Sequence, residues 1–217
     1  MRLLCTIIKQ EWLLLIREPR FWIPFLLPPL LLLLLQFLLF SKQNIGAGQP
    51  LFLAQWMLLL GVLVAPMSAS IAADSFAGEQ ERNSLELLLL SPIPSKTLFL
   101  AKFLATIPFP VIFILLIQAF YFHYHSIAVI YFIKALVGAI SASFIVNAFA
   151  LWVSLKSKTV RTANQSSLLV LFPILVLVQW KGAFYLESVQ AFFVVFVFTI
   201  LILSFFFLLS LREFKKL

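Results

Sequence analysis

Residues 76–102 read F-A-G-E-Q-E-R-N-S-L-E-L-L-L-L-S-P-I-P-S-K-T-L-F-L-A-K and lie between two long apolar runs. Four of the chain's eight acidic residues lie in this stretch or just before it: Asp74, Glu79, Glu81 and Glu86. The apolar runs on either side have the composition of membrane spans. The arrangement therefore predicts spans that hold a charged connector at a membrane surface, where it meets another protein.

Composition supports this prediction. Of 217 residues, 63% are hydrophobic and only 11% are charged, which excludes a soluble globular domain. The apolar runs are about 20 residues long, as spanning helices require, whereas barrel strands alternate over about 10 residues. The +8 charge lies mostly at the ends of these runs, so it predicts contact with lipid headgroups and no binding of nucleic acid. A single cysteine, Cys5, excludes an intrachain disulfide and favours a reducing cytosolic setting.

We predict an all-α integral membrane protein with six transmembrane helices, an N-terminal interfacial helix and a cytosolic helix between spans two and three. The spans are expected at about residues 21–40, 51–73, 103–122, 127–152, 166–180 and 188–211. We expect the whole chain to form one transmembrane domain. Its parts are 1–20 interfacial helix, 21–73 spans one and two, 74–98 cytosolic segment, 99–152 spans three and four, 153–165 cytosolic loop, 166–211 spans five and six, and 212–217 cytosolic tail. For residues 2–20 the alternative is an extension of the first span.

The positions of the basic residues predict the orientation. With both termini in the cytosol, the outer segments hold only Lys42, Lys134 and Lys181, and every other lysine and arginine falls on the cytosolic side. This asymmetry follows the positive-inside rule. We therefore expect a multi-pass protein of the cell membrane.

The fifth apolar run, Ser166 to Trp180, would reach only about 22 Å as a helix, against a hydrocarbon core of about 30 Å. Two interpretations remain. The helix recruits the uncharged residues 162–164, or the apolar residues Gly182 to Leu186 dip back into the membrane as a re-entrant segment.

The charged stretch itself predicts a helix from Ser75 to Leu90. Glu79 and Arg82 are three residues apart, and Arg82 and Glu86 are four apart, so these side chains can pair on its surface. Ser91-Pro92-Ile93-Pro94 ends the helix, because proline removes a backbone donor and disfavours helical geometry before it. The leucines at 85 and 87–90 predict a face that embeds in a partner's groove; the alternative is a connector lying on lipid.

Small residues gather in two spans and predict close contact with other helices. In the second span they are Ala65, Ser68, Ala69, Ser70, Ala72 and Ala73, interrupted by Pro66, and in the fourth they are Gly138, Ala139, Ser141, Ala142, Ser143 and Ala148.

Three further sets of residues are weaker site candidates. Ser143 and Asn147, one turn apart, either bond a neighbouring helix or line a transport path, and the packing role is favoured. Lys134 either meets an anionic substrate on that path or, as we favour, extends to the outer headgroups. His123 and His125 follow the third span in a predicted tight turn and have no third metal ligand nearby, so interfacial anchoring is favoured over metal or haem binding.

The segment S-F-A-G-E-Q-E-R-N-S-L-E-L-L-L-L-S-P-I-P, followed by Lys102, resembles the hallmark of the type-2 ATP-binding-cassette (ABC) exporter permeases. In that family a Glu-Arg pair, a small-Thr-Leu-Glu core and a Ser-Pro turn recur between the second and third spans. The resemblance is specific over about 30 residues and extends more loosely to the R-E-P-R break at 17–20 and the six spans. Asn83-Ser84 stands where Gly-Thr or Lys-Thr is more usual, and Ser84 keeps the hydroxyl.

The resemblance implies a coupling helix that docks into a groove of a separate ABC ATPase subunit. The residues that match the family pattern are Glu79, Glu81, Arg82, Leu85, Glu86, Ser91 and Pro92. None of the six glycines belongs to a G-x-x-x-x-G-K-[ST] loop, so we expect no enzyme activity and no cofactor in this chain, with ATP and Mg²⁺ on the partner ATPase. A second permease copy or a related permease is expected beside it, in the lipid bilayer.

The resulting hypothesis is the permease subunit of an ATP-driven exporter of a substrate such as a drug, peptide or lipid. Within the same class, a haem-exporter permease of cytochrome c maturation has similar length and a similar L-E-L-L-x-x-P turn. From other classes, a membrane scaffold remains an alternative. An intramembrane enzyme is disfavoured, since the sequence has no H-E-x-x-H, no G-x-S-x-G and no paired carboxylates within a span.

Overall fold

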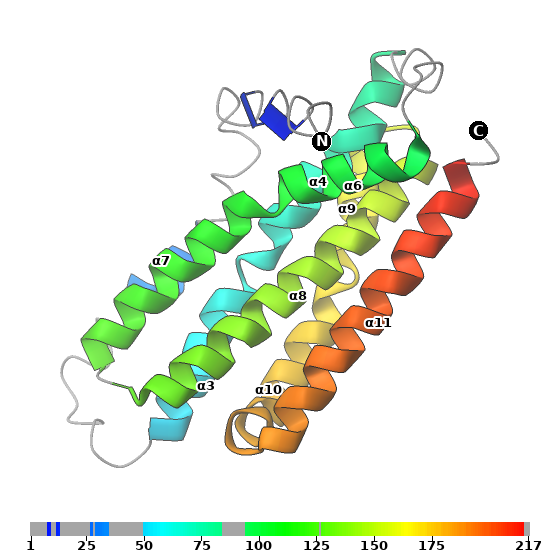
Figure 1. Ribbon diagram of the computed structural model, residues 1–217. Helices are drawn as coiled ribbons and strands as arrows, with labels where there is room; N and C mark the ends of the chain where they lie inside the picture. Colours follow the sequence, from blue (N-terminus) through cyan, green and yellow to red (C-terminus); the bar gives the residue numbers. More distant parts are fainter. Residues whose placement is uncertain are drawn as a thin grey trace.

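The computed structural model describes residues 8–9, 12–13, 27, 29–34, 50–83, 94–125 and 127–214, and every regular element in these ranges is a helix (Figure 1). The main helices are α3 (Pro50–Val62), α4 (Ala65–Glu81), α6 (Ser95–Thr106), α7 (Pro108–His125), α8 (Val129–Lys156), α9 (Val160–Leu168), α10 (Leu171–Glu187) and α11 (Val189–Phe214).

Five stretches of the described chain are helical, long and apolar enough to cross a membrane: Pro50–Glu81, Lys96–His125, Val129–Lys156, Val160–Glu187 and Val189–Glu213. They match predicted spans two to six and support the all-α membrane architecture. Most of the predicted first span and of the interfacial helix over residues 1–20 lies outside the described residues. The count of six spans therefore stays a prediction.

The second span differs from the expected single helix over residues 51–73. It is divided at Leu63 and Val64 into α3 and α4, and α4 begins with Pro66 in its first turn. Because proline has no N–H, the backbone ladder is interrupted there. α4 then continues past Ala73 to Glu81, so residues 74–81 extend the span as helix.

The third span also begins earlier and ends later than residues 103–122. It consists of α6 and α7, separated at Ile107. The carbonyls of Leu104 and Thr106 would accept hydrogen bonds from residues 108 and 110 in an unbroken helix, and both are prolines. The predicted turn at His123 to His125 is wrong, because these residues form the last turn of α7.

The fifth span shows no re-entrant segment. α10 continues as helix through Gly182–Leu186 to Glu187, and α9 precedes it from Val160, so Val160–Glu187 is long enough to cross. The predicted loop over residues 153–165 shrinks to the short link between Lys156 and Val160, because α8 and α9 extend into it from both sides. The periodicity of apolar residues did not indicate α9, because most residues of this helix are polar or small. The helix begins instead with a turn that Thr159 caps.

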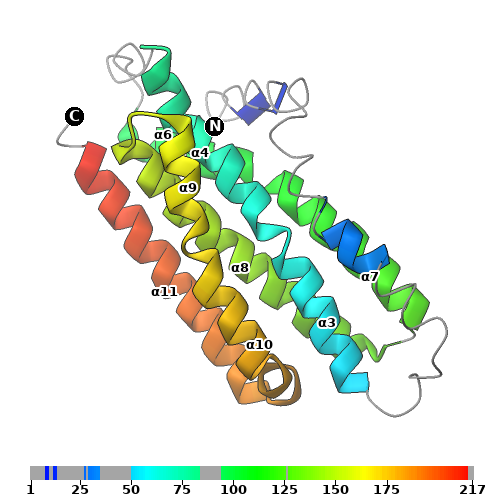
Figure 2. The same cartoon turned by 180° about the vertical axis from the view of Figure 1, so that it is seen from behind.

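Helix α8 runs through the middle of the bundle, with α7 along one side and α11 along the other (Figures 1 and 2). The small residues of α4 are buried and pack mainly along α8, as predicted. Helix α3 also approaches α8 closely: a Cβ atom built at Gly61 would lie 2.6 Å from that of Ala139. Small residues thus place the second span against the fourth.

One end of the bundle collects most of the described charged side chains. Here α4, α8 and α11 end while α6 and α9 begin, at the top of Figures 1 and 2. We call it the charged end and define it by Glu79, Glu81, Arg82, Lys102 and Lys156. It corresponds to the side that the basic residues predict to be cytosolic.

Candidate functional site

The centre of the charged end is a buried lysine. Lys102 on α6 is only 1% exposed, and its Nζ donates hydrogen bonds to the Ser75 carbonyl at 2.6 Å and to Glu79 Oε1 at 2.7 Å. The same nitrogen lies 4.9 Å from the centre of the Phe76 ring. We call Ser75, Phe76, Glu79 and Lys102 the lysine clamp.

The lysine clamp supplies the contacts that a buried ammonium group needs in place of water. A buried ammonium is costly unless it is paired and hydrogen-bonded, and a carboxylate, a carbonyl and an aromatic face supply these contacts to Lys102. Ser75, Phe76 and Glu79 lie within about one turn of α4, so the ammonium of α6 holds one face of that helix. The clamp joins the start of the third span to the end of the second.

Helix α8 holds the same turns of α4 through a hydroxyl group. Ser154 Oγ accepts hydrogen bonds from the backbone N–H of Phe76, at 3.1 Å, and of Ala77, at 2.9 Å. It donates one to the Ala73 carbonyl at 2.7 Å. The side chain is fully buried, so it connects α4 to α8 where water does not compete.

Helix α9 is tied to the last residue of α4. Glu81 Oε1 accepts a hydrogen bond of 2.8 Å from the Val160 N–H, in the first turn of α9. Thr159 caps the same turn by accepting from the Thr162 N–H at 3.2 Å. A carboxylate at a helix N-terminus is favourable because unpaired N–H groups and the helix dipole point at it. Glu81 thereby connects the second span to the start of the fifth.

The end of α4 itself is abrupt, so the predicted continuous helix from Ser75 to Leu90 is wrong. Arg82 is the C-cap residue, and Asn83 follows with a φ of 53°, a left-handed conformation typical of a helix end. Among the described residues, Arg82 lies 3.9 Å from Asp74 and Glu79 bonds to Lys102, while the predicted pair of Arg82 with Glu86 lies outside the described residues. Of the predicted coupling residues, Leu85, Glu86, Ser91 and Pro92 lie outside the described residues.

The structure gives Lys134 a different environment from the predicted position at the outer headgroups. Its side chain is buried, and Nζ donates to the carbonyls of Leu186 at 2.6 Å and Glu187 at 3.2 Å, the last residues of α10. The ammonium therefore caps a helix C-terminus, where carbonyls lack partners. Tyr185 donates in return to the Lys134 carbonyl at 2.8 Å.

Ser143 and Asn147 lie inside helix contacts. Asn147 is fully buried, accepts a hydrogen bond of 2.8 Å from Thr106 Oγ1 and donates one of 3.4 Å to the Phe103 carbonyl. The Ser143 carbonyl accepts from Ser68 Oγ at 3.2 Å. The contacts of Asn147 agree with the favoured packing role, whereas Ser143 contributes its carbonyl and its buried hydroxyl has no hydrogen-bond partner among the described residues. A part in a transport path stays a prediction for both residues, as it does for Lys134.

Among the described residues, neither His123 nor His125 has the neighbours that a metal site needs. No group of three or more His, Cys, Asp or Glu side chains that could hold a metal occurs among the residues that the structure describes. The His125 ring instead packs at 4.4 Å against Tyr121 and at 4.9 Å against Tyr124. This aromatic environment suits the interfacial role that the sequence favours.

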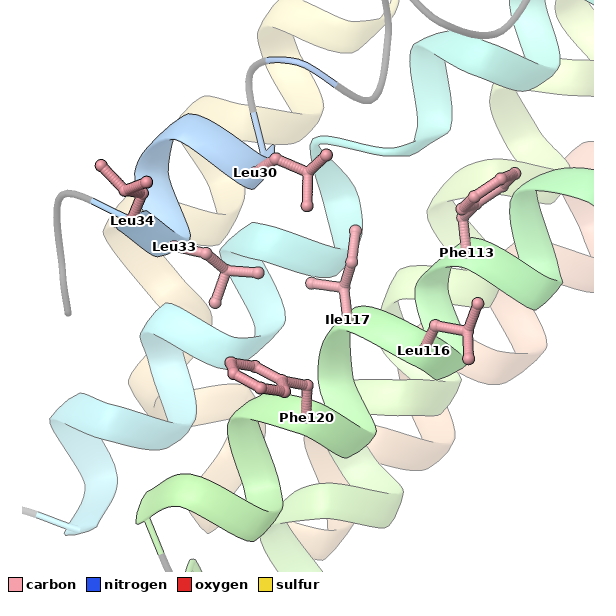
Figure 3. A pocket seen from close by; sticks show the side chains of 7 residues that line it. All are labelled: Leu30, Leu33, Leu34, Phe113, Leu116, Ile117 and Phe120. Atoms are coloured by element: carbon pink, nitrogen blue, oxygen red, sulfur yellow. The ribbon is translucent and has the colours of Figure 1, made fainter.

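An apolar pocket of about 580 Å³ lies between residues 29–34 and α7 (Figure 3). Its lining consists of Leu30, Leu33, Leu34, Phe113, Leu116, Ile117 and Phe120. With hydrocarbon walls, it suits an acyl chain or another apolar group and offers no polar group to orient one.

Sequence reasoning missed three contacts that hold the site together. Ser154 and Thr106 each occur as one hydroxyl next to an apolar run, a pattern with little information of its own. Trp12 donates its indole N–H to the Ala105 carbonyl at 3.1 Å and packs against Phe109 at 5.8 Å, beside the break in the third span. The sequence feature that could have indicated a contact between spans was Lys102, because a charged residue in the first turns of a membrane span needs a partner.

Comparison with known families gives one match. Residues 2–179 match the family model described as ABC-2 type transporter. No curated protein is significantly similar to the chain. The matched range includes every residue of the lysine clamp and all seven predicted coupling residues.

Proposed function

The chain belongs to the ABC-2 type transporter family, and we propose that it is the permease of an ATP-driven exporter whose ATPase is a separate subunit. In this proposal the ATPase docks on the connector that follows α4, and nucleotide turnover moves the spans. The substrate is a drug, a peptide or a lipid, and a second permease, identical or related, completes the path.

The observation that carries the proposal is the way in which α4 ends. Its last turns contact three other spans through specific polar groups: Lys102 of α6, Ser154 of α8 and the Val160 N–H of α9. A free connector lying on lipid needs no such links. A helix end tied to three spans is suited to pass a displacement from a docked partner into the bundle.

The orientation of the carboxylates refines the docking hypothesis. Glu79 is largely buried and bonds to Lys102, and Glu81, although exposed, bonds to the Val160 N–H of its own chain, whereas the side chain of Arg82 is 60% exposed. We therefore assign docking to Arg82 and to the connector that contains Glu86, and assign Glu79 and Glu81 to transmission within the permease. A charge reversal at Glu79 would report on the lysine clamp before it reports on docking.

The test is co-purification from the native membrane in mild detergent. The wild-type chain is expected to bring a soluble ATPase with it in a fixed ratio, and Glu86→Arg is expected to lose it. Glu187→Arg is the matched control, since Glu187 is exposed at the opposite end of the bundle and the charge change is the same. A folded wild-type protein without any ATPase would reject the proposal in favour of a membrane scaffold.

A further inference from the structure

We propose that Lys102 is the positioning residue that makes α6 move together with α4, so that displacement of the α4 end bends the third span at Ile107. This inference rests on the proposed function and assigns to the lysine clamp a part in coupling. Three features of the structure support it.

First, the lysine clamp connects α6 directly to the last turns of α4. The Lys102 ammonium reaches across from α6 to a carbonyl and a carboxylate on α4, at 2.6 and 2.7 Å. The three clamp residues of α4 lie in its last turns, immediately before Arg82 and the connector. A movement of the connector thus reaches Lys102 within about one helical turn, or 5.4 Å.

Second, the far end of α6 is also held. Thr106 donates to Asn147 Oδ1 at 2.8 Å, and Asn147 donates to the Phe103 carbonyl at 3.4 Å. Asn147 belongs to α8, which binds α4 through Ser154. The charged-end segments of α4, α6 and α8 therefore form one polar-linked body.

Third, the connection from this body to α7 is weak. Pro108 and Pro110 remove two backbone donors at the junction, and the Val111 N–H bonds the Ile107 carbonyl at 3.2 Å to restart the ladder. Kinks at such positions bend at low cost, because fewer backbone hydrogen bonds oppose the motion. Movement of α6 with α4 is thus expected to change the angle between α6 and α7.

Stability alone does not explain why an ion pair occupies this place. Replacing both members of a buried pair by apolar residues of similar volume is often neutral or stabilising, whereas removing one member leaves a buried charge without its partner. The double variant Glu79→Leu/Lys102→Met is therefore expected to fold. It removes the polar link and keeps the volume, which makes it the informative variant.

The experiment measures the angle between α6 and α7 in the complex with the co-purified ATPase, reconstituted in lipid nanodiscs. Spin labels are placed at Leu100→Cys and Leu116→Cys in a Cys5→Ser background, which removes the chain's single cysteine. Both sites are exposed, at 41% and 60%, and they are about 24 Å apart along a straight helix. Distances are recorded without nucleotide and after trapping with Mg²⁺, ATP and vanadate.

The wild type is expected to change its label distance on trapping, and the double variant is expected to lose at least half of that change while retaining the ATPase in the wild-type ratio. Lys96→Met, which removes an exposed lysine from the same helix, is the matched control and should keep the full change. Labels at the exposed Val194 and Leu208, both on α11, should show no change in any variant.

Each other outcome overturns the inference. A full distance change in the double variant means that Lys102 does not couple the helices. No change in the wild type means that the third span does not bend at Ile107, even though an ATPase is bound. If no ATPase accompanies the wild-type chain, the proposed function itself fails. The co-purification ratio alone distinguishes this outcome from a failure of the inference about Lys102.

Discussion

The second and sixth spans of this protein differ almost completely in what surrounds them. In the apolar window of Pro50–Glu81, 89% of residues are buried inside the structure, whereas in Val189–Glu213 only 6% are. The α4 half of the second span is rich in alanine and serine, whereas α11, the sixth span, is rich in phenylalanine and leucine. In a membrane, small residues mark helices that contact protein, and bulky apolar residues mark helices that contact lipid or another chain.

The two spans also differ in the hydrogen bonds that their polar side chains make. The lysine clamp, Ser154 and Glu81 all act on the second span, while Thr199 and Ser210 of α11 bond carbonyls of their own helix. Polar side chains therefore connect the inner span to three neighbouring helices, whereas the polar link described for the outer span is the ion pair of Glu213 with Lys156 of α8, at 3.2 Å. Four predictions test this division, in order of decreasing effect.

The largest effect is expected for Lys102→Ala. Removing one partner of a buried ion pair leaves Glu79 largely buried without its ammonium, which costs about 3–5 kcal/mol of unfolding free energy. Because the Glu79 side chain is 21% exposed, we expect the lower end of that range. Denaturant unfolding in detergent, followed by tryptophan fluorescence, measures the loss.

The double variant Glu79→Leu/Lys102→Met is the control for this measurement. It should recover most of the lost stability, since no buried charge remains. Equal losses in the single and double variants would show that packing of the lysine stem, and not its charge, holds the two helices together.

The second effect is steric. Gly61→Ala would place a methyl group against the buried Gln118 amide of α7 and 2.6 Å from Ala139 Cβ of α8, which forces α3 away from both helices and costs about 1–3 kcal/mol. Gly182→Ala is the matched control, because its nearest neighbour is the flexible Gln55 side chain at 3.4 Å. Thermal unfolding of the two variants should separate them clearly. Similar midpoints would indicate that the inner span tolerates looser packing than the geometry implies.

The third effect concerns the link between α4 and α8. Ser154→Ala removes a donor to Ala73 and an acceptor for two N–H groups, and buried groups left without partners cost about 1–3 kcal/mol. Ser157→Ala is the control, since its hydroxyl bonds Val153 of the same helix. Hydrogen exchange at Phe76 and Ala77 should accelerate only in the first variant, and unchanged protection would refute the link.

Much of the fold follows from composition and spacing. Apolar runs of spanning length predict the helical membrane architecture, and the small residues of the second and fourth spans predict their contact. Helix ends were less predictable. α8 and α9 extend into the stretch 153–165 that polar composition assigned to a loop, because capping contacts such as Thr159 with Thr162 and Glu81 with Val160 stabilise turns that hydropathy does not detect.

The site was predictable in position but not in geometry. Residue spacing placed Glu79 beside Arg82 on an exposed helix, since sequence separation is the only distance that a sequence provides. The true partner, Lys102, is 23 residues away and becomes close only when α4 and α6 pack side by side. In the same way, Lys134 finds the end of α10 across the bundle, which no local pattern indicates.

The smallest effect is expected on the outer span, where Phe198→Leu should change the stability of the isolated chain by less than about 0.5 kcal/mol. Phe198 is 59% exposed, so the substitution leaves the packing inside the chain almost unchanged. The informative measurement on the Phe198→Leu variant is the fraction of paired permeases in lipid nanodiscs. Weaker pairing would mean that the phenylalanines of α11 face another permease, because a lipid-facing surface exchanges one apolar side chain for another at little cost. Unchanged pairing would place lipid against α11 and move the search for the interface to the fifth span, Val160–Glu187, where 11% of the residues in the apolar window are buried.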